Sequence, residues 1–377
     1  MTRLGDVCEK IGSGATPRGG KEAYKDAGIP IIRSQNIHDW VFQPDGLAFL
    51  DDEQAESLSN VEVRSNDVLL NITGDSVARA CIVPSERIPA RVNQHVAIVR
   101  AGKEINPTYL LASLQSKKTT LLSLASSGAT RNALTKRMIE NLDIDLPSRE
   151  IQDSIAQVLD SIQYKITLNN RLNDYLADFA STVFQNQASH IEERIALFDI
   201  ADIKYGKGLA KNELVEDGYP VFGGNGQIGF YSKYLYEEPQ ILISCRGAAS
   251  GKVLVSLPKS FITSNSLIIE LKDRRYYEYL KQYFMLHQLY DYATGSAQPQ
   301  ITIDGLRHLT VPYPPFDLIK TLTNQLKAIS DCIYSNDIEN QALSRLRDTL
   351  LPKLMSGEID VSKVDLTQLT NNHLADC

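Results

Sequence analysis

The chain has 377 residues, which allows two or three domains at roughly 100 to 200 residues each. Apolar residues make up 43% and charged residues 23% of the chain, a composition that excludes a disordered or fibrous protein. The net charge of −7 excludes a general basic surface that would bind nucleic acid without specificity, so any contact with DNA has to be local.

No run of apolar residues approaches the roughly 20 that a membrane span needs, and the first residues do not resemble a signal peptide. We therefore expect a cytoplasmic protein. The five cysteines include no Cys-x-x-Cys pair, and the six histidines include no His-Glu-x-x-His motif. Neither a metal site nor a disulfide framework is expected.

The first part of the chain, residues 1–147, predicts a mixed α/β domain. Short β-rich runs such as 68–70 alternate with Gly, Asn and Pro turns, and a helical stretch is expected near 109–124. Residues 148–187 contain almost no Gly or Pro and repeat their apolar residues at helical spacing. They predict one long helix.

The second half of the chain has the same order of elements. Residues 188–315 predict a second mixed α/β domain, residues 316–358 predict a second long helix, and residues 359–377 form a tail. The sequence therefore predicts an α+β protein in which two mixed α/β domains are separated by two long helices.

An internal repeat explains this order. Residues 128–183 align with a segment that follows 167 positions later, and Asp67 to Gly74 matches Gln240 to Gly247 at an offset of 173. The larger offset farther upstream indicates about 18 extra residues between positions 37 and 67 of the first copy.

The two long helices carry apolar seams of the coiled-coil type. In the first helix the seam is interrupted by Asn169 and Asn173, and in the second by Asn336 and Asn340. If the helices run antiparallel about a pseudo-twofold axis, facing residue numbers sum to 509, so that Asn169 faces Asn340 and Asn173 faces Asn336. Buried asparagines cost stability but fix register. These four residues are therefore predicted to set the register of an antiparallel coiled coil.

A rod of about 35 to 40 residues would be on the order of 55 Å long and could hold the two α/β domains a fixed distance apart. Two residues depart from the seam: Arg347 falls on a position that faces Ile162, and Pro352 should kink or end the second helix near its last turn. The alternative is that the helices belong to an ordinary bundle and the asparagines face solvent.

Short motifs occur throughout both copies. They are Leu4-Gly5-Asp6, Gly12-Ser13-Gly14-Ala15-Thr16-Pro17, Gly28-Ile29-Pro30, Asp67-Val68-Leu69-Leu70 with Gly74, Asn93-Gln94-His95, Asn106-Pro107-Thr108-Tyr109-Leu110, Leu142 to Pro147, Ile155 to Asp160, Phe222 to Gly226, and Leu350 to Ile359. With these motifs the chain resembles the specificity subunit of type I restriction-modification enzymes over nearly its whole length.

The resemblance implies two target-recognition domains that each read one half of a split DNA site, joined by two conserved helices that set the gap. Because the two copies differ, we expect an asymmetric site. The resemblance also implies that this chain is not itself catalytic. Its expected partners are double-stranded DNA, two methyltransferase subunits and restriction/translocase subunits, and S-adenosylmethionine, ATP and magnesium are expected only in those partner subunits.

Base edges in the major groove are read by Arg, Lys, Asn and Gln, while phosphates are held by Lys, Arg and backbone N–H groups. The candidate residues are Arg18, Lys21, Arg33, Gln35, Asn36, Arg79, Arg91, Asn93, Gln94 and Arg131 in the first domain, and Lys207, Lys211, Asn225, Gln227, Arg246, Lys252, Gln298 and Gln300 in the second. For each of them a solvated surface role is the competing interpretation, and Asn93 or Asn225 could simply satisfy a turn.

Three motifs that suggest an enzyme fail on inspection. Residues 247–253 have three residues where a phosphate loop needs four, residues 222–226 do not continue as Gly-x-Gly-x-x-Gly, and residues 312–316 lack the polar residue of a methyltransferase motif. Two other function classes stay open: a coiled-coil scaffold whose end domains bind proteins and never DNA, and a hydrolase or methyltransferase in its own right.

Overall fold

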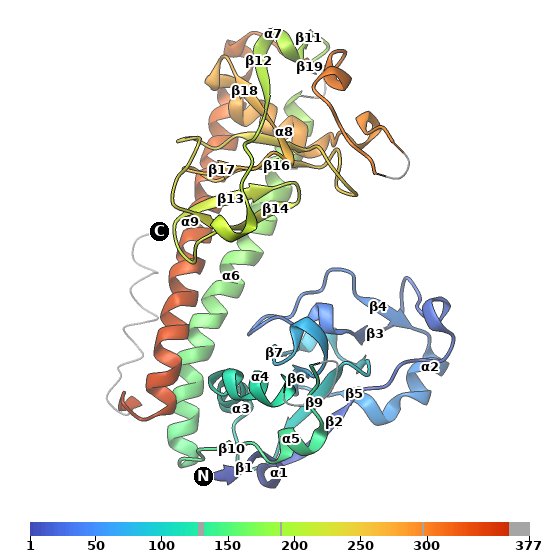
Figure 1. Cartoon of the computed structure of the whole chain (residues 1–377), viewed down its shortest axis with the longest axis vertical. Helices are drawn as coiled ribbons and strands as arrows, with labels where there is room; N and C mark the ends of the chain where they lie inside the picture. Colours follow the sequence, from blue (N-terminus) through green and yellow to red (C-terminus); the bar gives the residue numbers. More distant parts are fainter. Residues whose placement is uncertain (127–131, 189–190, 296–297, 362–377) are drawn as a thin grey trace. The chain divides into compact units, whose positions relative to one another are not determined.

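The computed structural model describes residues 1–126, 132–188, 191–295 and 298–361, apart from the side chain of Lys21 (Figure 1). The chain divides into two compact units: unit 1 comprises Met1–Leu168 and Ile338–Cys377, and unit 2 comprises Asn169–Asp337. The long helices α6 (Arg149–Ala188) and α9 (Phe316–Met355) have 40 residues each. One part of each helix belongs to unit 1 and the other part belongs to unit 2.

Unit 1 contains an α/β domain built on two four-stranded sheets. The main sheet has the antiparallel order β2 (Cys8–Ser13), β9 (Val96–Ala101), β6 (Val68–Asn71), β7 (Ala80–Ile82). The second sheet has the order β4 (Ala48–Leu50), β3 (Ile29–Ile32), β8 (Ala90–Val92), β5 (Glu62–Val63). Successive side chains of a strand point to opposite faces, so Leu70 packs on the helix side while Leu69 packs toward the second sheet.

The remaining elements of unit 1 surround these sheets. They are β1 (Thr2–Arg3), α1 (Leu4–Val7), α2 (Asp52–Ser57), α3 (Pro107–Ser116), α4 (Lys118–Ser126), α5 (Lys136–Glu140) and β10 (Asp143–Ile144), with β1 paired to β10. The first half of α6 belongs to the same core because Ile155, Leu159 and Ile162 are buried against the domain.

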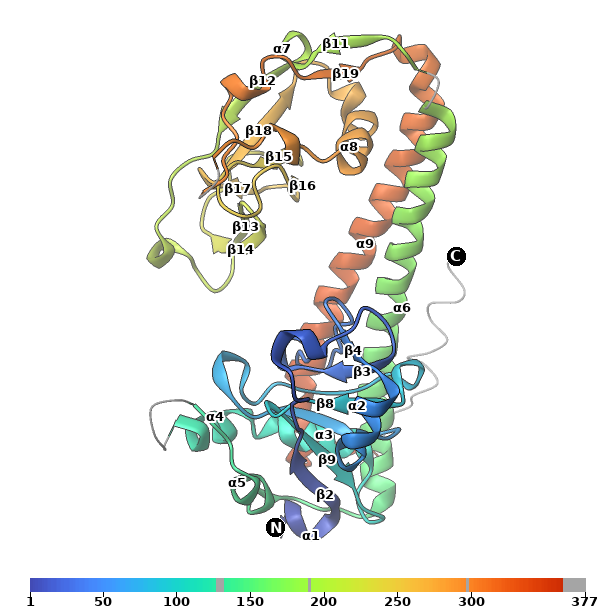
Figure 2. The ribbon, with the colours of Figure 1, turned by 90° about the vertical axis from the view of Figure 1, so that its right-hand side faces the viewer.

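Unit 2 repeats this architecture. Its main sheet has the antiparallel order β12 (Ala201–Tyr205), β18 (Ser266–Leu271), β15 (Ile241–Ser244), β16 (Val253–Val255), and its second sheet has the order β14 (Gly226–Tyr231), β13 (Tyr219–Gly223), β17 (Phe261–Ile262). The other elements are β11 (Arg194–Ala196), α7 (Leu197–Ile200), α8 (Tyr277–Leu286) and β19 (Thr310–Pro312). Helix α8 lies beside the long helices (Figure 2). Its Lys281 side chain contacts Ser330 of α9, and its Gln282 side chain donates to Ser181 of α6.

The two domains match strand by strand at the offsets read from the sequence. Strand β6 corresponds to β15 and strand β3 to β13, and the parallel pair β3–β8 corresponds to the parallel pair β13–β17. In the first copy the extra residues between positions 37 and 67 include α2 and β5, for which unit 2 has no counterpart in its described residues.

Within each unit the two long helices run side by side in opposite directions. In unit 2, Asn336 Nδ2 donates to Asn173 Oδ1 at 2.8 Å, and Asn173 Nδ2 donates to Asp337 Oδ1 at 2.9 Å. In unit 1, Lys165 pairs with Glu339 at 3.2 Å. Asn169 is 2% exposed. The contact of Asn169 with Asn340 and the part of these asparagines in setting the register stay predictions.

The two departures from the seam have local explanations. Arg347 is buried in unit 1, donates to Gln163 Oε1 at 2.9 Å, and places its guanidinium 5.1 Å from the centre of the Trp40 ring. The buried charge is therefore partnered by polar and aromatic groups of unit 1. Helix α9 continues through Pro352 and ends three residues later, where the missing N–H costs only one hydrogen bond of the last turn.

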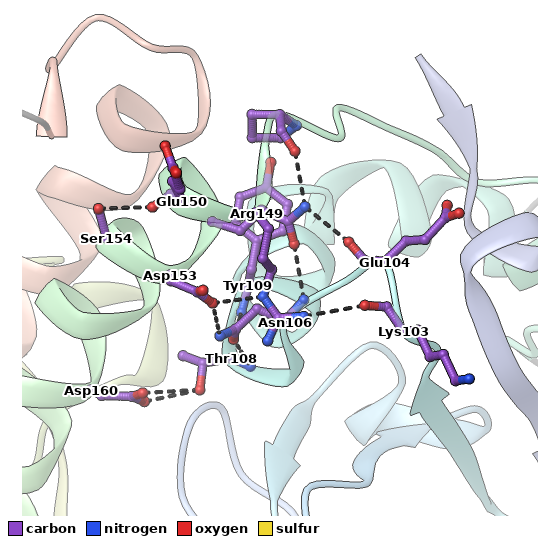
Figure 3. A network of polar contacts seen from close by, with 12 residues as sticks. Lys103, Glu104, Asn106, Thr108, Tyr109, Arg149, Glu150, Asp153, Ser154 and Asp160 are labelled. Atoms are coloured by element: carbon purple, nitrogen blue, oxygen red, sulfur yellow. Dashed lines mark hydrogen bonds and ion pairs between the residues drawn. The ribbon is translucent and has the colours of Figure 1, made fainter.

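A polar network attaches the start of α6 to the domain of unit 1 (Figure 3). Gln152 is buried, accepts a hydrogen bond from the Asn106 backbone N at 2.9 Å, and donates to the carbonyls of Glu104 and Pro147 at 3.1 and 2.9 Å. Around it, the Asn106 side chain donates to Asp153 at 2.8 Å. The start of the helix is therefore joined to the domain through the side chains of Gln152, Asn106 and Asp153.

We expect Gln152→Ala to lower the free energy of unfolding of unit 1 by about 1–3 kcal/mol, because it removes the three hydrogen bonds that the buried Gln152 side chain makes with Asn106, Glu104 and Pro147. Trp40 is the single tryptophan and lies in the unit 1 core, so urea unfolding followed by its fluorescence reports this unit. The exposed Gln157 on the same helix gives a matched control, and Gln157→Ala should leave the midpoint unchanged. Equal midpoints for the two variants would contradict the structural role of Gln152.

Candidate nucleic-acid interface

One end of the main sheet of unit 2 collects five loop segments. Strands β12 and β15 end there and strands β16 and β18 begin there, because the sheet is antiparallel. We call this surface the unit 2 loop end. Its described residues are 206–208, 223–226, 245–252, 263–265, and two parts of a fifth segment, 294–295 and 298–300.

Hydrogen bonds fix these segments to one another. Ser264 N donates to the Lys207 carbonyl at 3.0 Å, and Cys245 N donates to the Asn265 carbonyl at 3.0 Å. Lys252 Nζ donates to Asn225 Oδ1 at 2.9 Å, which brings the β13–β14 turn to the β15–β16 loop. The unit 2 loop end is therefore a single connected surface.

The unit 2 loop end carries cations without acids. Lys207, Arg246 and Lys252 belong to it, and the sequence of its segments contains no Asp or Glu, although the whole chain has a net charge of −7. Lys207 and Arg246 are exposed. A local positive surface with polar neighbours is what contact with a phosphate backbone requires.

The other residues predicted in unit 2 have different surroundings. Gln298 and Gln300 are exposed on the unit 2 loop end, and Gln227 is exposed on β14 beside it. Lys211 is also exposed, but it lies in the loop between β12 and β13, on the 3-10 turn Lys211–Glu213, outside the five segments.

Unit 1 has a corresponding surface, formed by residues 14–18, 72–79, 93–95 and 132–134, which we call the unit 1 loop end. Gly14 N donates to the Val96 carbonyl at 2.8 Å and Ile72 N donates to the His95 carbonyl at 3.0 Å. Thr73 Oγ1 and His95 Nδ1 are hydrogen bonded at 2.7 Å. The loops after β2 and β6 and the loop before β9 therefore meet as their counterparts do in unit 2.

Among the residues predicted in unit 1, Arg18 and Gln94 are exposed on the unit 1 loop end and Arg79 is half-buried there. Arg33 and Gln35 follow β3, and both donate to the Gly46 carbonyl, at 2.5 and 3.2 Å. The side chain of Lys21 and the whole of Arg131 lie outside the described residues.

Three residues predicted to contact DNA have structural roles instead. Asn36 is 0% exposed, and its side chain accepts from Arg33 N and donates to the carbonyls of Gln43 and Asp45. Arg91 is 5% exposed and its side chain pairs with Glu62 at 3.1 Å.

The third is Asn93, which is buried and accepts from His95 N at 3.1 Å, as a turn residue does. A side chain that is enclosed and already hydrogen bonded has no surface to present to a base, so the assignment of Asn36, Arg91 and Asn93 to DNA does not fit this structure.

Thr73 and His95 are candidate site residues that the sequence analysis did not select. The repeat offers a signal for them, because Thr73 matches Arg246 at the β6–β15 offset of 173, and His95 matches Asn265 at the β9–β18 offset of 170. Matched positions on two copies of one surface are candidates for different sequence preferences.

Metal-binding groups and nucleophilic thiols are two features that enzyme sites often use. The described ranges contain no group of three or more His, Cys, Asp or Glu side chains that could hold a metal ion. Burial raises the pKa of the Cys8 thiol to about 12 and also raises the pKa of Cys81, so neither thiol forms a nucleophilic thiolate at neutral pH. None of the helices in these ranges is both long and apolar enough for a membrane span.

Comparison with known proteins places this architecture. The model of the type I restriction modification DNA specificity domain matches residues 1–177 and 193–346. The type I restriction enzyme MjaIX specificity subunit of Methanocaldococcus jannaschii is 22% identical over 411 residues, which cover 97% of this chain and 94% of that protein. The type I restriction enzyme EcoprrI specificity subunit of Escherichia coli is 22% identical over 250 residues, which cover 59% of this chain and 61% of that protein.

A solved structure shares the fold. The S subunit of a type I restriction-modification system from M. genitalium matches with a TM-score of 0.54 and 18% identity, covering 94% of this chain and 95% of that chain. Each segment matched by the family model contains one α/β domain and most of the long helix that follows it. The chain therefore belongs to the family of type I restriction modification DNA specificity domain proteins, the specificity subunits.

Proposed function

We propose that this chain is the non-catalytic recognition subunit of a type I restriction-modification complex and that it reads a bipartite, asymmetric DNA site. The observation that carries the proposal is the presence of two loop ends built on the same strands in two repeated domains. One loop end would read each half of the site.

The proposed DNA contacts divide into two kinds. Lys207 and Lys252 of the unit 2 loop end, and Arg18 of the unit 1 loop end, have the charge to hold phosphates. Gln94, Arg246 and Gln300 have side chains that can pair with base edges in the major groove. Because matched positions differ between the copies, the two half-sites should differ in sequence.

Helices α6 and α9 are proposed to act as the ruler between the half-sites. Each has 40 residues, which corresponds to about 60 Å at 1.5 Å per residue. The antiparallel contacts within each unit, such as Asn173 with Asn336 and Lys165 with Glu339, support pairing as an antiparallel coiled coil.

Helix α6 also offers a surface for a partner subunit. Leu172, Tyr175 and Phe179, which all belong to unit 2, are spaced by three or four residues and are exposed, with Tyr175 at 71%. Exposed apolar residues on one helical stripe mark an interaction surface. We propose that the methyltransferase subunits, which would carry S-adenosylmethionine and the chemistry, bind there.

Changing Tyr175 and Phe179 together to Lys should weaken binding of the methyltransferase subunit by about 30-fold or more, because buried aromatic residues dominate interface energies. Sedimentation of the mixed subunits measures this affinity. Leu122→Lys, at an exposed apolar residue of α4, is the control and should leave the affinity unchanged. Unchanged binding of the double variant would remove α6 as the docking surface.

The proposed function is tested by footprinting the complex of this chain with its methyltransferase subunit on genomic target DNA. We expect two protected segments of different sequence separated by a segment that tolerates any sequence. One continuous protected site would contradict the ruler. No protection at any salt concentration would favour the protein-binding scaffold.

A further inference from the structure

Arg246 differs from the other arginines of the unit 2 domain because its guanidinium has no partner among the described residues, and it is exposed. The four others each have a hydrogen bond or ion pair: Arg194 with Thr310, Arg274 with Glu238, Arg275 with Asp273 and Arg307 with Asp304. Among the described residues of its α/β domain, unit 2 thus keeps the guanidinium of Arg246 available, and this group lies on the unit 2 loop end.

The backbone at Arg246 is held firmly although its side chain is exposed. Arg246 lies two residues after the end of β15 and forms an antiparallel bridge with Gln300. On either side, Cys245 N donates to the Asn265 carbonyl at 3.0 Å and Gly247 N donates to the Pro299 carbonyl at 3.0 Å. A recognition side chain placed on a fixed backbone of this kind can discriminate by geometry, because little freedom is lost when it binds.

The surroundings of Arg246 favour a base contact. Lys207 and Lys252 lie on the same loop end and can hold the phosphates, and the loop-end segments contain no carboxylate that would neutralise the guanidinium. A planar guanidinium donates two parallel hydrogen bonds to O6 and N7 of guanine, which is the commonest specific contact in the major groove.

The other copy of the repeat has a different group at this position. Thr73 corresponds to Arg246, and its hydroxyl is hydrogen bonded to His95 Nδ1 at 2.7 Å. A threonine hydroxyl cannot form the two-pronged contact with guanine. At this matched position the two domains therefore differ in their ability to recognise guanine, because only the Arg246 side chain can make the bidentate contact.

We propose that Arg246 is the residue that reads a guanine in the half-site bound by unit 2. This proposal rests on the DNA-recognition function proposed above. The half-site bound by unit 1 is not read in this way at the matched position. Arg246 is thus a specificity-determining residue, while Lys207 and Lys252 supply affinity that does not depend on sequence.

The test uses the complete complex with its methyltransferase subunit and measures methylation of a randomised plasmid library. For Arg246→Ala and for Arg246→Lys we expect one half of the motif to stay unchanged and the other half to lose its preference at one guanine by about 5- to 150-fold, the range given by one bidentate contact. Arg246→Lys keeps the charge but loses the fork, so it should retain more overall activity than Arg246→Ala while losing the same base preference.

Arg307→Ala is the control, because Arg307 is also exposed but lies just before β19 and is paired with Asp304, and it should leave the motif unchanged. A motif that is unaltered in both Arg246 variants, a uniform loss of methylation at all sites, or a relaxed position that is not guanine would each overturn the assignment of Arg246. Absence of a split motif for the unaltered chain would instead overturn the proposed function itself.

Discussion

Inserting four residues into each long helix, after Leu168 and after Asp337, should move modification to sites whose gap is longer by one or two base pairs. The insertion lengthens each helix by about 6 Å, and one base-pair step is about 3.4 Å. Both insertion points lie at the division between the units, so each α/β domain keeps its own contacts. Methylation of plasmids that carry the two half-sites at graded spacing measures the shift.

Methylation of plasmids with the original spacing should fall to the same extent as methylation of plasmids with the longer spacing rises. The control changes α6 without lengthening it: alanine at the exposed residues Gln157, Asp174 and Asp178 should keep the original gap. If the insertion variant methylates the original spacing as well as the unaltered chain does, the helices do not act as a ruler.

Asp67→Ala should destabilise unit 1 by about 3–5 kcal/mol, the cost of leaving one member of a buried ion pair without its partner. Asp67 is fully buried and accepts two hydrogen bonds from Arg100, at 2.7 and 2.8 Å, and one from Arg64 N at 2.7 Å. The substitution therefore leaves a cation and a backbone N–H without their shared acceptor. Chemical unfolding followed by the fluorescence of Trp40 measures the loss.

Asp304→Ala is the matched control for this measurement. Asp304 also pairs with an arginine, Arg307, but this pair lies in unit 2 and is exposed. An exposed ion pair contributes little to the free energy of unfolding. The Trp40 transition should be unchanged in this variant, and a similar midpoint for the two variants would show that burial of the Asp67 pair does not stabilise unit 1.

The large elements were predictable from the sequence because they depend on local patterns. The runs with almost no Gly or Pro correspond to α6 and α9, and the segments aligned by the repeat correspond to equivalent strands. The meeting of Asn173 with Asn336 was also accessible, because a helical seam and a pseudo-twofold axis together specify facing residues.

Individual site residues were harder to predict because exposure depends on distant partners. Arg91 was selected as a DNA contact, but its partners are the Ala55 carbonyl and Glu62, and both come from the segment that is extra in the first copy. No pattern around Arg91 reveals that this segment covers it. The surroundings of Arg347 were equally hard to predict, because its partner Trp40 lies about 300 positions away in the sequence.

Methylome sequencing of a cell that carries this gene and its methyltransferase subunit, compared with the same cell without this gene, measures directly whether this chain selects a split DNA site. We expect one methylated motif to disappear with the gene, and we expect this motif to consist of two different half-sites separated by a fixed number of unspecified bases. An unchanged methylome, or loss of a continuous or palindromic motif, would contradict it.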